Sequence, residues 1–436
     1  MFKQNANNSI KNKIKTTSIN TILLFFSIYL CFGILEITSF CILAFKQNVL
    51  KTSVKADMNF LYNAGLPRIF KPIGYNAESP GPWPLLMSSS PAYKNDRWAN
   101  DFWRYEHRRY QIIDETFQPN VIWRSKYRRE LYVNIDKEGI RKTINPIIDN
   151  PKKQIDIFMF GGSTMYGTGV PDQFTIPSIL SKMLNENGNV FYKITNFGTG
   201  SYIINQDMQL LFDVVRKNNI PKIVIFYNGI NDTFSGVFSP GKPGWYLGSE
   251  QIEKKLVSVQ KNEKWKYMLN TMKLAAKVKN KLFTKELDNL FLNDYEKKAK
   301  AFIDYYKKSI LLIRNVCEYQ NIVPIFIWQP HLLFGNKPNS EFEKALIKNP
   351  TLLSIGSFNQ KEGIYLSKAM KTTYTILENE GVNIHGFYNF SRIFDDIKET
   401  LFLDYMHLGR EGNTIVSKQI VKIINEYNVI FMKSQK

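Results

Sequence analysis

IDIFMFGGSTMYG, residues 155–167, is the stretch that decides the fold. Its first six residues are apolar except Asp156, and they predict a buried strand over Ile155–Phe160. Two glycines and Ser163 follow at once, so the chain turns as soon as the strand ends. In open parallel α/β sheets, ligands bind where the strands end, and polar residues at such points are therefore the ones to inspect.

Four further β-rich runs follow this strand and alternate with helical patterns. The other expected strands are Phe191–Thr195, Lys222–Tyr227, Ile322–Trp328 and Val382–Tyr388. The expected helices are Phe174–Asn187, Ile204–Asn218, Tyr295–Tyr319, Gly363–Asn379 and Gly412–Tyr427. The alternation predicts an α/β domain over residues 154–430, with a mostly parallel five-stranded sheet between helices. It stops at residues 233–292, where we expect an inserted lysine-rich region.

Polar segments follow three of the strands and precede the last helix. They are GGSTMYG at 161–167, NFGTGSY at 196–202, NGIND at 228–232 and DYMH at 404–407. Together these segments contain the groups that acyl transfer needs. A serine hydroxyl is a weak nucleophile until a base takes its proton, and we expect His407 to do this for Ser163. Asp404 reaches the other ring nitrogen of His407 if the segment turns tightly.

The oxyanion that develops in acyl transfer needs hydrogen-bond donors. We assign this role to the side chain of Asn231 and to the backbone of the Gly200 and Ser201 turn, beside the N–H of Ser163. His331 also follows a strand and is an alternative base. No acidic residue stands at a spacing that would orient it, so a structural or substrate-contact role is favoured.

In their order, these segments resemble the signature blocks of the SGNH/GDSL hydrolase superfamily, over about residues 155–427. The resemblance implies a flavodoxin-like three-layer αβα sandwich with Ser163, Asp404 and His407 as a catalytic triad. The second block normally has a glycine five residues after its Asn, and here Ser201 occupies that position, directly after Gly200. The family's oxyanion-donor role is therefore assigned to Gly200 and Ser201 together. The α/β-hydrolase elbow is a poorer match, because Ser163 lacks the Gly-x-Ser-x-Gly frame.

Two further segments resemble features of membrane-anchored SGNH proteins associated with bacterial surface polysaccharides. They are IWQPH at 327–331 and VNIDKEGIR at 133–141. This resemblance implies an esterase that removes or transfers an O-acyl group, acetyl above all, on a carbohydrate polymer or glycoconjugate, with no metal or organic cofactor. Gln329, at a strand end, is expected to contact the substrate. The alternative is a non-catalytic carbohydrate-binding or assembly component of a polysaccharide biosynthesis or export system.

The N-terminus predicts a membrane anchor. Residues 1–17 form a basic tail, and residues 18–45 are apolar apart from Glu36, which is long enough to span a bilayer as a helix. A cleaved signal peptide is the alternative, but no small-x-small cleavage site precedes Lys46. The basic tail favours the cytoplasm. We therefore expect a single-pass membrane protein whose catalytic domain is extracytoplasmic, either periplasmic or at the cell surface.

Residues 46–153 are rich in proline and aromatic residues and predict an extended arm with short strands. Within it, Asn120–Trp123 and Leu131–Ile135 are expected to pair. Three tryptophans of the arm either form a sugar-stacking platform or pack the arm against the body. They are Trp98, Trp103 and Trp123.

The net charge of +20 is consistent with solvated lysine-rich helix faces or with attraction to anionic lipid or an acidic polymer. Nucleic acid is not an expected partner of an anchored extracytoplasmic domain. The sequence contains no zinc-ligand spacing and no P-loop. Two of the three cysteines lie in the predicted anchor, which excludes a disulfide framework within one copy.

Overall fold

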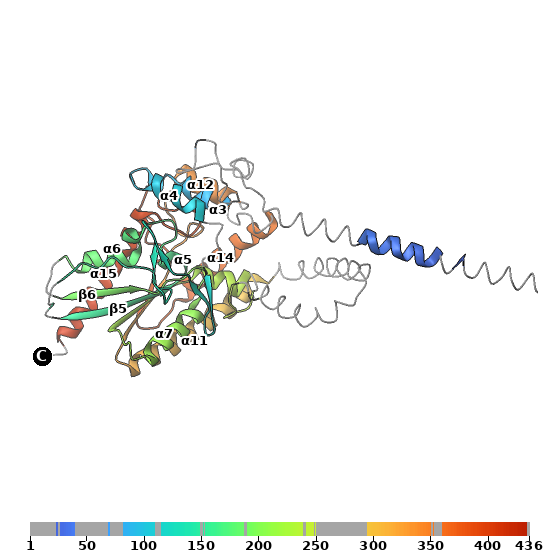
Figure 1. The fold of residues 1–436 in the computed structure, drawn as a ribbon. Helices are drawn as coiled ribbons and strands as arrows, with labels where there is room; N and C mark the ends of the chain where they lie inside the picture. Colours follow the sequence, from blue (N-terminus) through green and yellow to red (C-terminus); the bar gives the residue numbers. More distant parts are fainter. Residues whose placement is uncertain are drawn as a thin grey trace, which may run out of the picture. The chain divides into compact units, whose positions relative to one another are not determined.

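Figure 1 shows the fold of this chain in a computed structural model. The structure describes residues 23–24, 27–39, 69, 82–109, 115–148, 151, 153–186, 190–238, 241–247, 249, 294–349, 352 and 360–433. The chain divides into two units, one made of residues 1–54 and 251–293 and the other of residues 55–250 and 294–436. All helices and strands named below belong to the second unit.

Five parallel strands form the central sheet of this unit. They are β5 (Gln154–Gly161), β6 (Phe191–Asn196), β7 (Ile223–Asn228), β8 (Val323–Trp328) and β9 (Phe387–Asn389). Their spatial order is β6-β5-β7-β8-β9. Counted along the chain this is 2-1-3-4-5, a common doubly wound order. Strand β7 is buried along its whole length, as expected of a parallel strand that is covered on both faces.

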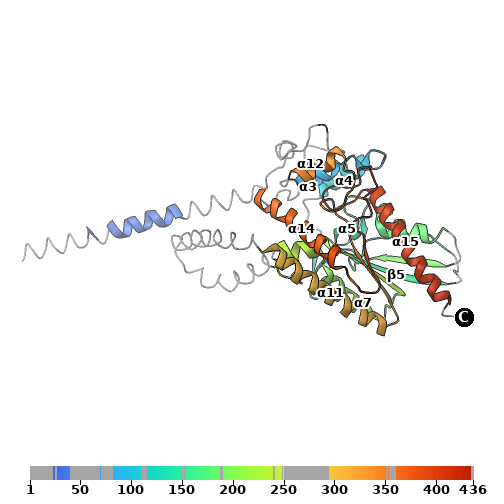
Figure 2. The same cartoon turned by 180° about the vertical axis from the view of Figure 1, so that it is seen from behind.

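Helices cover both faces of the sheet, which gives three layers. On one face α6 (Ile176–Leu184) packs against α15 (Arg410–Lys433), and on the other α7 (Ile204–Arg216) packs against α11 (Tyr295–Tyr319), as Figure 1 and the reverse view in Figure 2 show. Helix α14 (Gln360–Glu380) packs on α11. The shorter elements are α5 (Ser163–Tyr166), η2 (Asp172–Phe174), α8 (Ile230–Thr233), η3 (Phe234–Phe238) and α12 (Glu341–Lys348).

A row of buried aromatic rings runs across the sheet and fixes its register. Phe160 stacks between Phe197 and Phe226, with ring centroids 5.0 and 5.1 Å away, and Phe226 stacks on Phe326 at 5.4 Å. Three of these rings come from neighbouring strands whose residues pair directly, Phe160 with Phe226 and Phe226 with Phe326, and Phe197 follows the last residue of β6. The stacked row therefore aligns the carboxyl ends of the strands, where the polar segments begin.

Residues 82–148, which we call the N-terminal segment, contain two α-helices, one 3-10 helix and two hairpins in their described part, which leaves out residues 110–114. The elements are α3 (Pro82–Ser88), η1 (Pro91–Tyr93), α4 (Ala99–Arg109), β1 (Glu115–Gln118), β2 (Ile122–Ser125), β3 (Arg128–Arg129) and β4 (Asn134–Ile135). Tyr93, Phe102 and Trp103 form the centre of a buried cluster in this segment. The short strands that the sequence predicted are present, but the helices were not predicted, because prolines and clustered aromatic residues conceal their periodicity.

The predicted strand pairing within this segment is wrong. Strand β2 pairs with β1, and β4 pairs with β3, both antiparallel. The expected partners, Asn120–Trp123 and Leu131–Ile135, do not pair with each other. The physical reason is loop length, since each strand meets a closer partner across a loop of three or four residues, and short hairpins form most readily.

The expected parallel five-stranded sheet between helices is confirmed. Strand β9 is shorter than the predicted Val382–Tyr388. None of the helices in the described part of the chain is both long and apolar enough to cross a membrane. Of the predicted span, 18–45, only residues 23–24 and 27–39 are described, and they are helical. The predicted tail, 1–17, and residues 250–292 of the predicted insertion lie outside the described residues.

Candidate active site

Ser163 is the first residue of α5, and only Gly162 separates it from Gly161, the last residue of β5. The turn requires a very small residue at Gly162, because a Cβ built there would lie 2.3 Å from Nδ2 of Asn231. Helix α5 lasts one turn and is capped at its C-terminus by Gly167, whose φ is 91°. Only glycine adopts such a φ at no steric cost. The Ser163 hydroxyl is thus presented, partly exposed, at the carboxyl edge of the sheet.

The loop that carries Asp404 and His407 folds back on itself. The carboxylate oxygen Oδ1 of Asp404 accepts the N–H groups of Met406 (2.8 Å) and His407 (2.7 Å). The N–H of Leu403 donates to the carbonyl of His407 at 2.8 Å and closes the turn. An Asp side chain that accepts backbone N–H groups two and three residues on stabilises such a turn. This is why a spacing of three residues brings the two side chains together.

Ser163, His407 and Asp404 form one chain of hydrogen bonds. His407 Nε2 lies 2.8 Å from Ser163 Oγ, and His407 Nδ1 lies 2.6 Å from Asp404 Oδ2. The imidazole and the carboxylate are 1% and 0% exposed. A base held between a hydroxyl and a carboxylate in this way is fixed in the tautomer that can accept the hydroxyl proton.

Asp404 is surrounded by donors that favour its ionised form. Burial by itself would raise the pKa of this carboxyl. The charge interaction with His407, the hydrogen bond from its ring and the backbone N–H groups of His407 and Met406 outweigh burial and lower the pKa. Asp404 therefore remains a carboxylate at neutral pH.

Asn231 lies against the turn that carries Ser163. Its Nδ2 donates to the carbonyl of Tyr202 at 2.9 Å and contacts Gly162, the residue before Ser163. An Asn amide has two N–H bonds. One of them is occupied by the carbonyl of Tyr202, and among the described residues no acceptor occupies the other.

The Gly200 and Ser201 turn is tied to the same edge of the sheet. The N–H of Thr199 donates to the carbonyl of Gly161 at 3.0 Å. Ser201 is exposed and has a φ of 63°, the left-handed conformation that a non-glycine residue adopts only at a cost. Ser201 thus keeps the backbone conformation that a glycine would favour. Among the described residues, no acceptor occupies the N–H of Gly200 or Ser201.

Two buried carboxyl groups lie behind the expected oxyanion donors. Asp232 accepts the N–H groups of Ile204 (2.7 Å) and Gly229 (3.2 Å), and burial raises its pKa to about 6. Asp207 accepts from Asn228 Nδ2 at 2.8 Å, and burial raises its pKa well above the usual value. No sequence pattern singles out Asp207.

The other candidate residues, His331 and Gln329, make different contacts. His331 is buried, and its Nδ1 accepts the N–H of Leu333 at 3.0 Å. Burial, with Lys371 nearby, lowers the pKa of His331 to about 3, and its ring packs edge-on against Tyr374. Gln329 is 4% exposed, and its backbone carbonyl accepts from the Tyr374 hydroxyl at 2.8 Å. Among the described contacts, neither residue touches Ser163 or His407.

The three tryptophans named from the sequence have different surroundings. Trp103 is buried, and Trp98 stacks on Phe174 with centroids 5.2 Å apart. Trp123 is partly exposed, and its indole N–H donates to the carbonyl of Gly200 at 3.0 Å. Packing therefore accounts for Trp98 and Trp103, whereas Trp123 reaches the site.

Two residues of the site region could not be found from the sequence. The indole N–H of Trp83, in α3, donates to Asp404 Oδ2 at 2.6 Å. Glu343, fully buried in α12, accepts the N–H groups of Leu401 (3.1 Å) and Phe402 (3.4 Å), just before Asp404. Glu343 is the N3 residue of a capping box that begins at Ser340, a pattern that predicts a helix start but not a contact with residues 401–402. Trp83 belongs to no motif and is 321 positions from its partner. Only the folded chain reveals these contacts.

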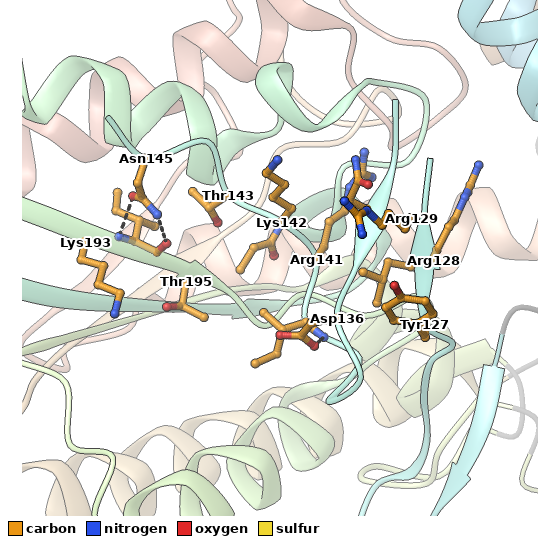
Figure 3. A pocket seen from close by; sticks show the side chains of 15 residues that line it. Tyr127, Arg128, Arg129, Asp136, Arg141, Lys142, Thr143, Asn145, Lys193 and Thr195 are labelled. Atoms are coloured by element: carbon orange, nitrogen blue, oxygen red, sulfur yellow. Dashed lines mark hydrogen bonds between the residues drawn. The ribbon is translucent and has the colours of Figure 1, made fainter. Parts of the chain in front are cut away.

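A separate pocket of about 400 Å³ lies beside the edge strand β6, and Figure 3 shows its lining. None of the predicted site residues lines it. Arg128 and Arg141 there are buried and paired with carboxylates, while Lys142 and Lys193 point in different directions. The pocket thus offers no convergent set of charges. In the part of the chain that is described, no group of His, Cys, Asp and Glu side chains is placed to hold a metal ion.

The comparisons with known proteins found similar solved structures only. No family model matches the chain, and no curated protein sequence matches it. An acetyl xylan esterase is 15% identical with a TM-score of 0.32, and covers 62% of this chain and 100% of its own. A putative lipolytic protein of the G-D-S-L family from Desulfitobacterium hafniense is 11% identical with a TM-score of 0.30, over 62% of this chain and 99% of its own.

An acetylxylan esterase from Geobacillus stearothermophilus is 10% identical with a TM-score of 0.32, over 62% of this chain and 93% of its own. The chain is thus similar in structure to GDSL-family lipolytic proteins and acetyl xylan esterases.

Proposed function

We propose that this chain is a serine esterase of the SGNH type that removes or transfers an O-acyl group, acetyl above all, on a carbohydrate polymer or glycoconjugate. One observation carries the proposal: the chain of hydrogen bonds from Ser163 Oγ through His407 to Asp404, at 2.8 and 2.6 Å. These distances are those expected of a nucleophile, its general base and the group that orients the base.

The reaction begins when Ser163 Oγ attacks the ester carbonyl carbon. His407 Nε2 takes the hydroxyl proton as the new C–O bond forms, and the carbonyl oxygen becomes an oxyanion that the N–H groups of Asn231 and the Gly200 and Ser201 turn stabilise. The intermediate then expels the sugar oxygen, which receives the proton from His407. Ser163 is left acylated. Asp404 stays ionised throughout and stabilises the imidazolium.

The second half of the reaction repeats these steps with a new nucleophile. Water or a sugar hydroxyl gives its proton to His407 and attacks the acyl-enzyme, and Ser163 leaves with that proton. Water yields hydrolysis, and a sugar hydroxyl yields acyl transfer. Both use the same residues, so the accepting molecule decides the outcome.

The carbohydrate substrate and the membrane location are part of the same proposal. The substrate class rests on the resemblance of residues 327–331 and 133–141 to surface-polysaccharide-associated SGNH proteins. The location rests on the basic tail at 1–17 and the apolar run at 18–45. Removing residues 1–45 should shift the protein from the membrane fraction to the soluble fraction. If the truncated protein stays in the membrane fraction, residues 1–45 are not what attaches the protein to the membrane.

The chemistry is tested with a fluorophosphonate and with an activated acetate ester. The full-length chain should become labelled and should release acetate, and Ser163→Ala should lose both activities. Ser309→Ala is the matched control, since Ser309 is on α11 and its hydroxyl donates within the helix to the carbonyl of Tyr305. Labelling that survives in Ser163→Ala would remove Ser163 as the nucleophile. An unlabelled parent chain would favour the non-catalytic carbohydrate-binding alternative.

A further inference from the structure

Trp83 is hydrogen-bonded to the carboxylate that orients the proposed base. Its indole N–H donates to Asp404 Oδ2 at 2.6 Å, and this same oxygen lies 2.6 Å from His407 Nδ1. The Trp83 ring also lies against the His407 ring, with centroids 5.7 Å apart and a tilt of 58°. Asp404 thus receives four donors, two on each oxygen. Four is about the number that a carboxylate can accept.

Helix α3 holds Trp83 in place against the loop of Asp404. Leu85 and Leu86 of this helix are completely buried. Just after the helix, the Ser90 hydroxyl donates to the carbonyl of Phe402 at 2.7 Å. Trp83 and Asp404 are therefore attached to two backbones that are themselves joined.

An indole is well suited to this position. It donates a hydrogen bond but accepts none, so it cannot take the proton that His407 must carry. A neutral donor on Oδ2 stabilises the charge of Asp404 without neutralising it. It also fixes the direction in which Oδ2 faces His407.

Trp123 makes a comparable contact on the opposite side of the site. Its indole N–H donates to the carbonyl of Gly200, and its own carbonyl accepts from the Tyr202 hydroxyl. In a trans peptide the C=O and the following N–H point in opposite directions. A carbonyl of Gly200 held toward Trp123 therefore turns the N–H of Ser201 away from Trp123, where it is free to meet a substrate oxygen.

We propose that the N-terminal segment positions both sides of the active site, with Trp83 orienting Asp404 and Trp123 orienting the Gly200–Ser201 peptide. This inference rests on the proposed function. It means that the catalytic body, residues 154–430, does not complete its own site. Both tryptophans act through other groups and are positioning residues.

The two contacts give different kinetic signatures. Trp83→Phe removes a donor from the anionic Asp404–His407 pair, so the pair binds a proton more tightly. The acidic limb of the pH profile of kcat/KM should then move to higher pH by about half a unit, and kcat should fall about 10- to 100-fold. Trp123→Phe should lower kcat about 3- to 30-fold with the pH profile unmoved, because it loosens only an oxyanion donor.

Trp103→Phe is the matched control, because Trp103 is buried in the same segment and its ring contacts are Tyr93, Phe102 and His107. It should keep the parent pH profile and kcat per folded molecule. The inference is overturned if Trp83→Phe keeps the parent acidic limb, or if Trp103→Phe shifts it equally. Restoring the donor is a second check: an active Trp83→His enzyme should recover part of the lost kcat, and no recovery would count against the hydrogen bond.

Failure of the inference and failure of the proposed function are distinguishable. If the parent chain does not label with fluorophosphonate, the proposed function fails. The contact itself is then tested by the downfield proton resonance of His407 Nδ1–H in the full-length chain. Trp83→Phe should move this resonance, and Trp103→Phe should not. A resonance that stays in place in Trp83→Phe would show that Trp83 does not orient Asp404.

Discussion

The two sides of Ser163 are built differently. On the side of the base, Asp404 and His407 are at most 1% exposed, and both carboxylate oxygens are fully hydrogen-bonded. On the side of the oxyanion donors, Ser201 is exposed and Asn231 is partly exposed, with one amide N–H that meets no acceptor in the described part of the chain. The base is complete before substrate arrives, whereas the donors are left for the substrate oxygen to occupy. Disturbing the base should therefore affect proton transfer, and disturbing the donors should affect only the stability of the oxyanion.

Asp404→Asn should have the largest effect. The variant keeps an oxygen for the N–H groups of Met406 and His407 but places an NH₂ group opposite His407 Nδ1, which favours the wrong tautomer. We expect kcat to fall about 10,000-fold with the fold intact. The measurement is ester hydrolysis under saturating substrate, with circular dichroism to confirm folding.

Asp304→Asn is the control for this variant, because Asp304 is exposed on α11 and pairs there with Lys308. It should retain full activity. A folded Asp404→Asn enzyme within about tenfold of the parent would mean that His407 does not depend on Asp404 for its orientation.

Asn231→Ala should have the next largest effect, and it tests the side of the oxyanion donors. Removing one oxyanion donor costs about 100- to 1,000-fold in kcat in comparable sites. KM should change little, since the bond strengthens in the transition state. The pH profile of the variant should match the parent, because the base is untouched. A shifted acidic limb in Asn231→Ala would show that the two sides are coupled.

The sequence predicted the parts of this molecule that follow from local patterns. The helix Tyr295–Tyr319 was predicted with the bounds that the structure has, because an amphipathic period over 25 residues is a strong signal. Ser163, Asp404 and His407, which the structure brings within hydrogen-bond distance, were predicted as a group because each belongs to a short motif that follows a strand or precedes the last helix. Strand β9 was predicted too long, since Gly381 and Gly386, both at positive φ, limit its extent.

The remaining contacts depend on the approach of distant segments. Trp83 meets Asp404 across 321 residues, and Trp123 meets Gly200 across 77. No spacing rule connects such residues, because the packing of α3 and of the β1–β2 hairpin decides where the indoles lie. The N-terminal segment was therefore expected to be an extended arm, whereas its tryptophans contribute to the site.

Asp232→Asn should change how stability depends on pH on the oxyanion side. The pKa of Asp232 is raised from 3.8 to about 6 by burial, so the folded state holds this proton more tightly than the unfolded state does. The parent therefore loses stability from this group as pH rises from about 4 to 6, by at most about 3 kcal/mol. In the variant this contribution disappears.

The measurement is urea unfolding of parent and variant at pH 4 and pH 7. For each protein we take the difference in the free energy of unfolding between the two pH values, and we compare this difference between parent and variant. The Asn side chain also loses one acceptor oxygen, but that loss is the same at both pH values and cancels in the difference. Asp207→Asn is a useful companion, since burial raises the pKa of Asp207 in the same direction. An identical pH dependence in parent and Asp232→Asn would mean that the carboxyl is ionised in the folded protein near pH 5.

His331→Asn should have the smallest effect and distinguishes His331, which follows a strand, from the proposed base His407. The Asn oxygen can accept the N–H of Leu333 as His331 Nδ1 does, at 3.0 Å in the parent. Since burial with Lys371 nearby lowers the pKa of His331 to about 3, the ring is neutral near pH 7 and takes up no catalytic proton. We expect kcat/KM to stay within about twofold of the parent across pH 6–8. A loss of 100-fold or more in a folded His331→Asn enzyme would place His331 in the machinery and would end the assignment of His407 as the only base.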